Sequence, residues 1–270
     1  MSAIREIPLP TPRMIARIEG AIGWMIFNKP ERRNAVSSDM WEAIPAIMDA
    51  FEADPAVRVI VLRGAGETAF VAGADISEFE QKRSTPEQVA DYEAASDEAG
   101  HRIAVSPKPT IAMIRGFCIG GGVGIALDCD LRIAAEGAKF GVPATRLGLG
   151  YGPSGVKRLM DLVGPSHVKE IFFTARHFSA AEALGMGLIN RITPEDGLEA
   201  YVRGYAATIA ENAPLTMRAV KRTVAELSKA SPEADIAECE RLVQVCFDSA
   251  DYVEGRRAFM EKRRPVFNGR

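Results

Sequence analysis

Two stretches of small residues, each following an apolar run, are candidates for chemistry. The first is Phe70–Ile76, with the sequence FVAGADI, and the second is Gly116–Gly124, with the sequence GFCIGGGVG. Turns of this kind can leave backbone N–H groups bare and directed outward. Two such groups that converge on one carbonyl oxygen form an oxyanion hole, which stabilises negative charge as it develops on that oxygen. The two loops together therefore indicate chemistry at a carbonyl group.

Hydrophobic periodicity predicts the elements that hold these loops. Short β-branched runs predict strands, and apolar residues at intervals of three and four predict helices. Strands are expected at 14–19, 21–27, 57–62, 111–114 and 131–135, and helices at 38–52, 121–127 and 154–162. The order of strand, strand and helix recurs without an exact sequence repeat. The polar stretch 77–106 is expected to form an outer helix or a lid.

Beyond Pro165 the pattern is helical almost throughout. Helices are expected at 165–173, 179–186, 198–211, 214–229, 232–248 and 251–262. We therefore divide the chain into an α/β core of residues 1–195 and a helical region of residues 196–270. The later helices are amphipathic but have no second α/β core to cover, so contact between subunits is the natural way to bury their apolar faces.

Composition and charge exclude several classes of protein. With 47% hydrophobic and 26% charged residues, the chain is globular rather than disordered. The net charge of −3 argues against nucleic acid as a partner. The four cysteines lack metal-ligand spacing and predict reduced thiols, with no metal site. Neither a secretory signal nor an apolar run of the ~18 residues that span a membrane is visible, so we expect a cytoplasmic protein without a membrane partner.

Several motifs, spread in order along nearly the whole chain, resemble those of the crotonase (enoyl-CoA hydratase/isomerase) superfamily. Besides the two loops they are Asn28-Lys29-Pro30 with Asn34-Ala35, Asp128–Ala134, Phe140–Pro143, Ala181–Ile192 and Glu254–Arg263. No single motif is decisive, but the ordered set is specific. The resemblance implies a ββα spiral core of mixed α/β class with a C-terminal helical trimerisation region, often assembled as a dimer of trimers.

The resemblance also implies that the chain binds an acyl-CoA thioester and stabilises its enolate. It assigns the two oxyanion donors to the N–H groups of Ala72 and Gly121. It implies substrate contacts, some of them to coenzyme A on a neighbouring subunit, at Arg33, Phe70, Ala74, Asp75, Ile76, Phe259 and Lys262. The expected partners are an acyl-CoA and further copies of this chain, in a trimer or hexamer. No cofactor is expected, because coenzyme A enters as part of the substrate.

The chain departs from the family pattern where hydratases carry two catalytic glutamates. Those glutamates position a water molecule and move a proton. Gly124 and Ala144 occupy the corresponding positions here, and neither side chain can move a proton. The sequence therefore predicts a thioester-binding scaffold without the usual acid/base pair, and hydration by two glutamates is not expected.

Tyr151 is the candidate that remains in the second catalytic loop. The segment Leu147-Gly148-x-x-Tyr151 resembles methylmalonyl-CoA decarboxylases, although those enzymes carry a histidine where this chain has Ala74. Loss of CO2 generates the enolate by itself, so decarboxylation needs the oxyanion hole more than an acid or base. Tyr151 is thus either a catalytic hydroxyl or an amphipathic residue at the rim of the site.

Three functions remain open. The first is an acyl-CoA lyase, isomerase or decarboxylase, and the second is a non-catalytic subunit that binds coenzyme A. The third is a serine hydrolase built on Ser154 and the histidines, which is disfavoured because the G-x-S-x-G spacing is absent and Ser154 suits a helix N-cap better. The sequence does not identify the acyl group, or distinguish a trimer from a hexamer.

Overall fold

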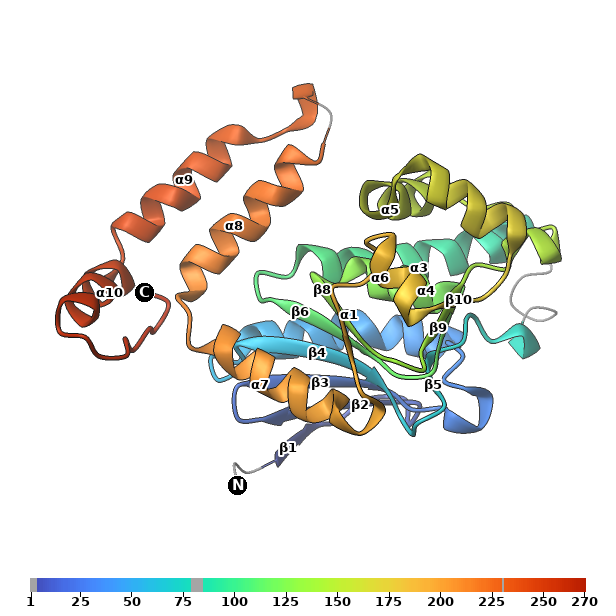
Figure 1. The fold of residues 1–270 in the computed structure, drawn as a ribbon, viewed down its shortest axis with the longest axis horizontal. Coiled ribbons are helices and arrows are strands. Elements are labelled where there is room, and N and C mark those ends of the chain that lie inside the picture. Colours follow the sequence, from blue (N-terminus) through green and yellow to red (C-terminus); the bar gives the residue numbers. More distant parts are fainter. Residues whose placement is uncertain (1–3, 79–84, 230) are drawn as a thin grey trace.

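A computed structural model describes residues 4–78, 85–229 and 231–270 of the chain. Two β-sheets lie at the centre, helices cover them, and a helical arm extends to one side (Figure 1). None of the helices in these described ranges has both the length and the apolar composition needed to cross a membrane.

The larger sheet has seven strands in the order β1-β2-β3-β4-β6-β8-β11. Strands β1 to β3 pair antiparallel, and β3, β4, β6, β8 and β11 pair parallel. The bounds are β1 Ile4–Ile7, β2 Met14–Glu19, β3 Ile22–Phe27, β4 Val59–Gly64, β6 Thr110–Ile114, β8 Leu131–Ala135 and β11 Arg191–Thr193. The predicted strands are confirmed. Strand β1 was not predicted, because its mostly exposed residues give no core-facing pattern.

The smaller sheet has four short strands in the order β10-β9-β7-β5. They are β5 Ala69–Val71, β7 Phe117–Ile119, β9 Lys139–Gly141 and β10 Phe178–Ser179. Three successive units of the chain give one strand to the larger sheet, one to the smaller sheet and then a helix. This arrangement is the expected ββα spiral. The smaller sheet itself was not predicted, since strands of two or three residues are too short to show a period.

The helices largely follow the expected segments. They are α1 Ser38–Ala53, α3 Pro86–Val105, α4 Gly121–Asp128, α5 Pro153–Thr174, α6 Ala180–Gly185, α7 Leu198–Ala210, α8 Pro214–Leu227, α9 Ile236–Phe247 and α10 Ala250–Met260. Helix α5 joins two expected helices across Gly164, whose φ of +74° interrupts the helical backbone. Helix α3 fulfils the outer-helix expectation for the polar stretch 77–106, of which residues 79–84 lie outside the described residues.

Two hydrophobic clusters hold the core together. On one face of the larger sheet, α7 packs Leu198, Val202 and Ala206 against strand residues that include Trp24 and Val61. On the other face, a larger cluster joins α1, α4, α5 and the smaller sheet. The described cysteines are free thiols, and three of the four are buried.

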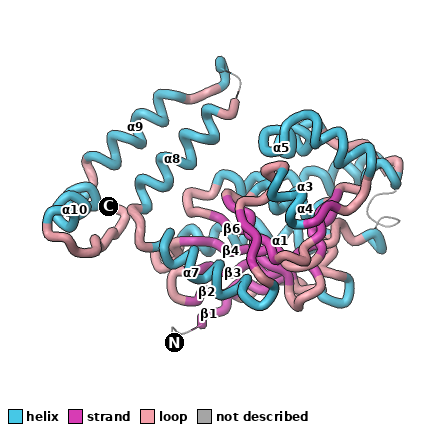
Figure 2. The backbone as a smooth tube through the Cα atoms, in the orientation of Figure 1, coloured by secondary structure: helices cyan, strands magenta, loops and turns pink. Residues whose placement is uncertain are grey.

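Helices α8, α9 and α10 form the arm, which stands away from both sheets (Figure 2). The last strand ends at Thr193, close to the boundary near residue 195 that the sequence predicts. Helix α7, however, lies against the larger sheet, so the part of the chain that stands apart begins with α8.

Asp128, at the end of α4, joins three helices. Arg158 Nη1 of α5 donates to Asp128 Oδ1 at 2.9 Å, and the carboxylate is buried. A Cβ atom on Gly100 of α3 would lie only 2.4 Å from Asp128 Oδ2, so α3 packs directly on this carboxylate. Burial raises the pKa of Asp128 to about 6; Arg158 opposes this effect and Asp97 adds to it.

This raised pKa predicts a pH-dependent contribution to stability. Because the folded-state pKa of about 6 exceeds the ordinary value of 3.8, the contribution is fully present below pH ~4 and is lost as the pH rises through 6. Asp128→Asn keeps an acceptor for Arg158 but cannot titrate. Relative to the parent, the variant should gain roughly 1–3 kcal/mol in free energy of unfolding between pH 4 and 7, measured by urea denaturation. A difference independent of pH would contradict this assignment.

Candidate active site

The first predicted loop follows β5 and is built around a buried anchor. The Phe70 side chain is 1% exposed and packs edge-to-face on Phe27, with ring centroids 5.9 Å apart. Its side chain therefore belongs to the core, and the expected substrate contact at Phe70 is not available to that side chain. Gly73, with a φ of +105°, turns the chain outward after the strand.

The hydrogen bonds of this loop correct the predicted donor. The Ala72 N–H donates to Arg33 O at 3.1 Å. This N–H is therefore paired, although the sequence led us to expect it to be bare. Val36 holds the next residues, since its N–H donates to Gly73 O and its carbonyl accepts from the Asp75 N–H, both at 2.9 Å. Within the described part of the chain, the Ala74 N–H donates to no acceptor. The bare N–H of this loop is therefore that of Ala74.

The second loop ends at the first residue of α4. Gly120 has a φ of +55° and a ψ of −115°, a conformation that glycine readily adopts, and it reverses the chain between β7 and the helix. Gly121 is the first helical residue, and the first N–H groups of a helix have no partner within it. None of the described residues accepts a hydrogen bond from the Gly121 N–H. The helix dipole adds partial positive charge at this end.

The two bare N–H groups lie side by side. A Cβ atom on Gly121 would lie 3.8 Å from Ala74 N and 3.7 Å from Cζ2 of Trp41. This approach depends on the neighbouring Gly122, where a Cβ atom would lie 2.1 Å from Val71 O, so any side chain there would push α4 away from β5. The arrangement can hold one oxygen atom between two donors and stabilise negative charge on it.

A buried ion pair between Lys29 and Asp75 stabilises the first loop. Lys29 Nζ pairs with Asp75 Oδ2, and both side chains are almost completely buried. Asp75 Oδ1 accepts hydrogen bonds from the Ser77 hydroxyl at 2.7 Å and the Ser77 N–H at 3.0 Å. Burial alone would raise the pKa of Asp75, but the hydrogen bonds from Lys29 and Ser77 hold the pKa below its usual value. Asp75 therefore carries a structural charge next to the donors.

The two positions that lack glutamates differ from each other. A Cβ atom on Gly124 would meet nothing within 4 Å, so open space lies beside this residue of α4. Ala144 is buried at the start of a 3-10 helix, Ala144–Leu147, and its carbonyl accepts from the Leu149 N–H at 3.0 Å. Neither residue supplies a proton donor or acceptor through its side chain.

Tyr151 is held against α5. A Cβ atom on Gly155 would lie 2.7 Å from Tyr151 Cε1, and the ring centroid is 4.8 Å from that of Phe172. Burial raises the pKa of Tyr151, Arg158 partly opposes this effect, and Asp128 adds to it. The phenol is thus protonated at neutral pH and can donate a hydrogen bond.

The other predicted substrate residues are divided between two places. Arg33 lies near the loops, with its guanidinium 5.0 Å from the centre of the Phe117 ring. Phe259 and Lys262 lie in and just after α10, on the arm, and one chain does not bring them to the loops (Figure 1). The side chain of Ile76 lies outside the described residues.

Ser154 does not form the expected helix cap. The N-cap of α5 is Gly152, and Ser154 is an exposed residue of the first turn. Among the histidines considered together with Ser154, His167 has its Nδ1 atom 2.9 Å from Val163 O, so this ring nitrogen pairs within α5.

Sequence reasoning missed two residues of the site. Trp41 lies in α1 and reaches Gly121, and Val36 bridges the first loop. The helical pattern over 38–52 did not single out Trp41, and a pattern within one helix does not show which loop a side chain meets. Val36 lies outside regular elements and gave no signal.

A ββα spiral whose two loops leave neighbouring N–H groups bare is the type of scaffold that can bind a carbonyl oxygen. Comparisons with known proteins identify the family. The sequence profile described as enoyl-CoA hydratase/isomerase matches residues 17–270. The chain therefore belongs to the enoyl-CoA hydratase/isomerase family, in the crotonase superfamily.

Individual relatives cover nearly the whole chain. The short-chain-enoyl-CoA hydratase of Clostridium acetobutylicum is 33% identical over 93% of this chain and 95% of its own. The crotonyl-CoA hydratase of Syntrophomonas wolfei is 34% identical over 94% of this chain and 97% of its own. An enoyl-CoA hydratase/carnitine racemase from Magnetospirillum magneticum superposes with a TM-score of 0.90 at 36% identity, covering 96% of this chain and 97% of its own.

The buried Lys29–Asp75 pair leads to a test of how the first loop is supported. Lys29→Met alone leaves an unpaired buried carboxylate and should lower the free energy of unfolding by ~3–5 kcal/mol. Lys29→Met with Asp75→Asn removes both charges and should cost clearly less than the single variant. Urea denaturation at pH 7 measures both values. If the double variant is less stable than Lys29→Met, the pair does not act as described.

Proposed function

We propose that this protein binds an acyl-CoA with its thioester oxygen between the N–H groups of Ala74 and Gly121, and stabilises the enolate formed there. The observation that carries this proposal is the closeness of two bare donors, one of them at a helix N-terminus. The names of the relatives support a CoA thioester as the ligand, since they describe enoyl-CoA and crotonyl-CoA hydratases. No separate cofactor is required, because coenzyme A is part of the substrate.

The donor assignment can be tested by replacing single backbone amides with esters. An α-hydroxy acid at position 74 removes the N–H and keeps the methyl group. Loss of one oxyanion donor typically costs ~10²–10³ in turnover. The same replacement at Ala72 is the matched control, since it removes only the bond to Arg33 O and should leave turnover closer to that of the parent. Equal losses at the two positions, or none at 74, would contradict the assignment.

The absence of both glutamates favours chemistry other than two-glutamate hydration. Each missing acid/base group typically costs ~10²–10⁴ in rate, so crotonyl-CoA hydration should be weak or absent. The open space beside Gly124 allows a gain-of-function test. Gly124→Glu should raise hydration of crotonyl-CoA, while Gly124→Gln, of similar size but uncharged, should not. Parent hydration at the rate of a two-glutamate enzyme would show that another residue supplies the proton.

A decarboxylase is the second candidate function, and it is favoured by the absence of carboxylates in the second catalytic loop, where Tyr151 stands. The Tyr151 side chain is half-buried, and its phenol is protonated because burial raises the pKa. We infer that the hydroxyl orients a leaving carboxylate or the enolate. Tyr151→Phe should then lower turnover at least ~10-fold with little change in binding, as for an interaction made only in the transition state. Equal turnover by parent and variant would reduce Tyr151 to a packing residue, and binding without any turnover would support the non-catalytic alternative.

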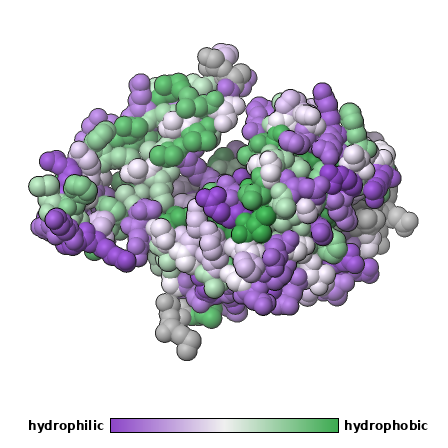
Figure 3. All heavy atoms as spheres, viewed as in Figure 1, coloured by the Kyte–Doolittle hydropathy of each residue, from purple (hydrophilic) through white to green (hydrophobic). Residues whose placement is uncertain are grey.

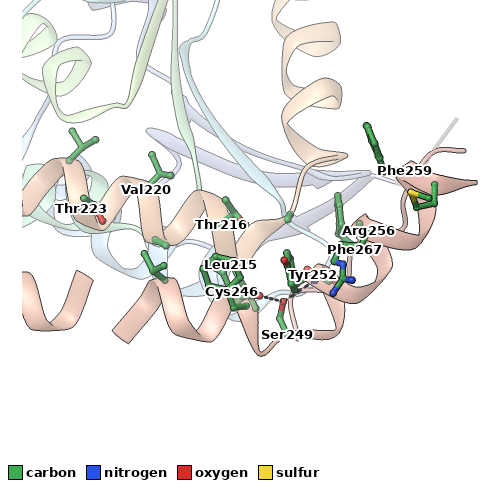
Figure 4. Close-up of a pocket in the computed structure, with 18 residues that line it drawn as sticks. Leu215, Thr216, Val220, Thr223, Cys246, Ser249, Tyr252, Arg256, Phe259 and Phe267 are labelled. Carbon is green, nitrogen blue, oxygen red and sulfur yellow. Dashed lines mark hydrogen bonds between the residues drawn. The ribbon is translucent and has the colours of Figure 1, made fainter. Parts of the chain in front are cut away.

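We also propose that the arm assembles the chain into a homotrimer or a dimer of trimers. Apolar residues gather along α8 and α9 (Figure 3), and a groove of about 1050 Å³ runs between α8, α9 and α10 (Figure 4). Phe259, at its edge, is 82% exposed. Burial of such a surface against another copy is favourable, and it would bring Phe259 and Lys262 to a neighbour's coenzyme A.

The assembly is tested by a charge at the apolar face of α8. Val224→Lys should shift the light-scattering mass from the trimer or hexamer toward the monomer, because the residue lines the groove and is 60% exposed in the single chain. Ile4→Lys is the control, since Ile4 is similarly exposed, at 56%, but lies on the edge strand β1. A monomeric and active parent protein at micromolar concentration would refute the proposal.

A further inference from the structure

Trp41, a residue of α1 and of neither loop, lies next to Gly121 in the proposed oxyanion hole. Its side chain projects from α1, is 5% exposed, and is part of the larger core cluster. Its Cζ2 atom and Ala74 N both lie within 4 Å of the point that a Cβ atom on Gly121 would occupy. Two covalent bonds separate that point from Gly121 N, so the edge of the indole ring lies within roughly 7 Å of this donor.

Tyr92 of α3 fixes the orientation of this ring. Trp41 Nε1 donates a hydrogen bond to the Tyr92 hydroxyl at 2.7 Å. The two rings meet edge-to-face, with centroids 6.4 Å apart and an interplanar angle of 85°. The indole is therefore held from two helices at once, and it cannot turn away without leaving its N–H unpaired.

We propose that Trp41, held by Tyr92, is a specificity wall that admits acyl groups with an unbranched α-carbon and rejects α-branched ones. This inference rests on the proposed function. A thioester oxygen would lie ~2.9 Å from Gly121 N, and the α-carbon is only two bonds from that oxygen. The α-carbon would then lie ~5 Å from Gly121 N, a distance comparable to that between this N and the ring edge, and the proposal places the α-carbon against the ring. In the proposed arrangement a straight enoyl group presents its α-hydrogen to the ring edge, whereas a methyl group in place of that hydrogen, coplanar with the double bond, would collide with the ring.

Intrinsic fluorescence gives a readout that does not depend on turnover. The chain has two tryptophans. Trp24 is fully buried in β3 beside Arg203 of α7, in the other hydrophobic cluster, and serves as an internal reference. Crotonyl-CoA should change the emission of the parent protein, and Trp41→Phe should abolish the change. If calorimetry detects crotonyl-CoA binding while the Trp41 emission stays constant, the inference that Trp41 borders the acyl group is wrong, and the proposed function stands.

Selectivity is tested with crotonyl-CoA and its 2-methyl analogue, tigloyl-CoA, which differ by one methyl group at the α-carbon. A methyl-sized misfit in an apolar pocket typically changes discrimination by roughly 10–200-fold, so the parent should bind crotonyl-CoA at least ~10-fold more tightly. Trp41→Leu should reduce this ratio toward one. Tyr92→Phe, which keeps the ring and removes the acceptor of the indole N–H, should reduce it in part.

Ile4→Leu on the exposed edge strand β1 is a control that should leave the ratio unchanged. An unchanged ratio in Trp41→Leu, with normal folding by circular dichroism, would overturn the inference. Failure of the parent to bind either thioester in the calorimeter would instead overturn the proposed function.

Discussion

The close approach of α4 to β5 is the constraint on which the rest of the site depends. At Gly122 the helix backbone contacts Val71 O so closely that a single added carbon would lie 2.1 Å from it. That contact brings the N-terminus of a helix, with its unpaired N–H groups and positive end, beside the loop that follows β5. A side chain at Gly122 would separate the two donors, and neither alone encloses an oxygen atom.

The surrounding structure keeps this approach rigid. Val36 binds both sides of Ala74 through its backbone, the Lys29–Asp75 pair supports the loop, and α4 lies within the larger core cluster. A preorganised pair of donors needs little rearrangement as charge develops, which is why such sites stabilise anions better than water does. The open space beside Gly124 distinguishes this chain from a scaffold with a glutamate there, because the two bare donors are present while a carboxylate at that position is absent.

The sequence predicted most strands of the larger sheet, most helices and both loops, since these depend on local periodicity, and the family resemblance supplied Gly121 as a donor. It misassigned the first donor. Ala72 and Ala74 are both small residues in one turn, and only the tertiary contact of the Ala72 N–H with Arg33 O decides which is bare. Trp41 and Phe70 show the same limit. The pattern over 38–52 did not single out Trp41, and the resemblance placed Phe70 at the substrate, although its side chain lies in the core. The roles of Tyr151 and of the arm remain predictions.

The carbonyl stretch of a bound thioester tests the central claim most directly. Crotonyl-CoA labelled with ¹³C at the thioester carbon gives an isolated band in difference infrared spectra. Two hydrogen bonds from Ala74 and Gly121 polarise the C=O bond, so the band should move to lower frequency on binding. The shift should become smaller when the amide at position 74 is replaced by an ester. A bound thioester whose band stays at its solution frequency would contradict the account.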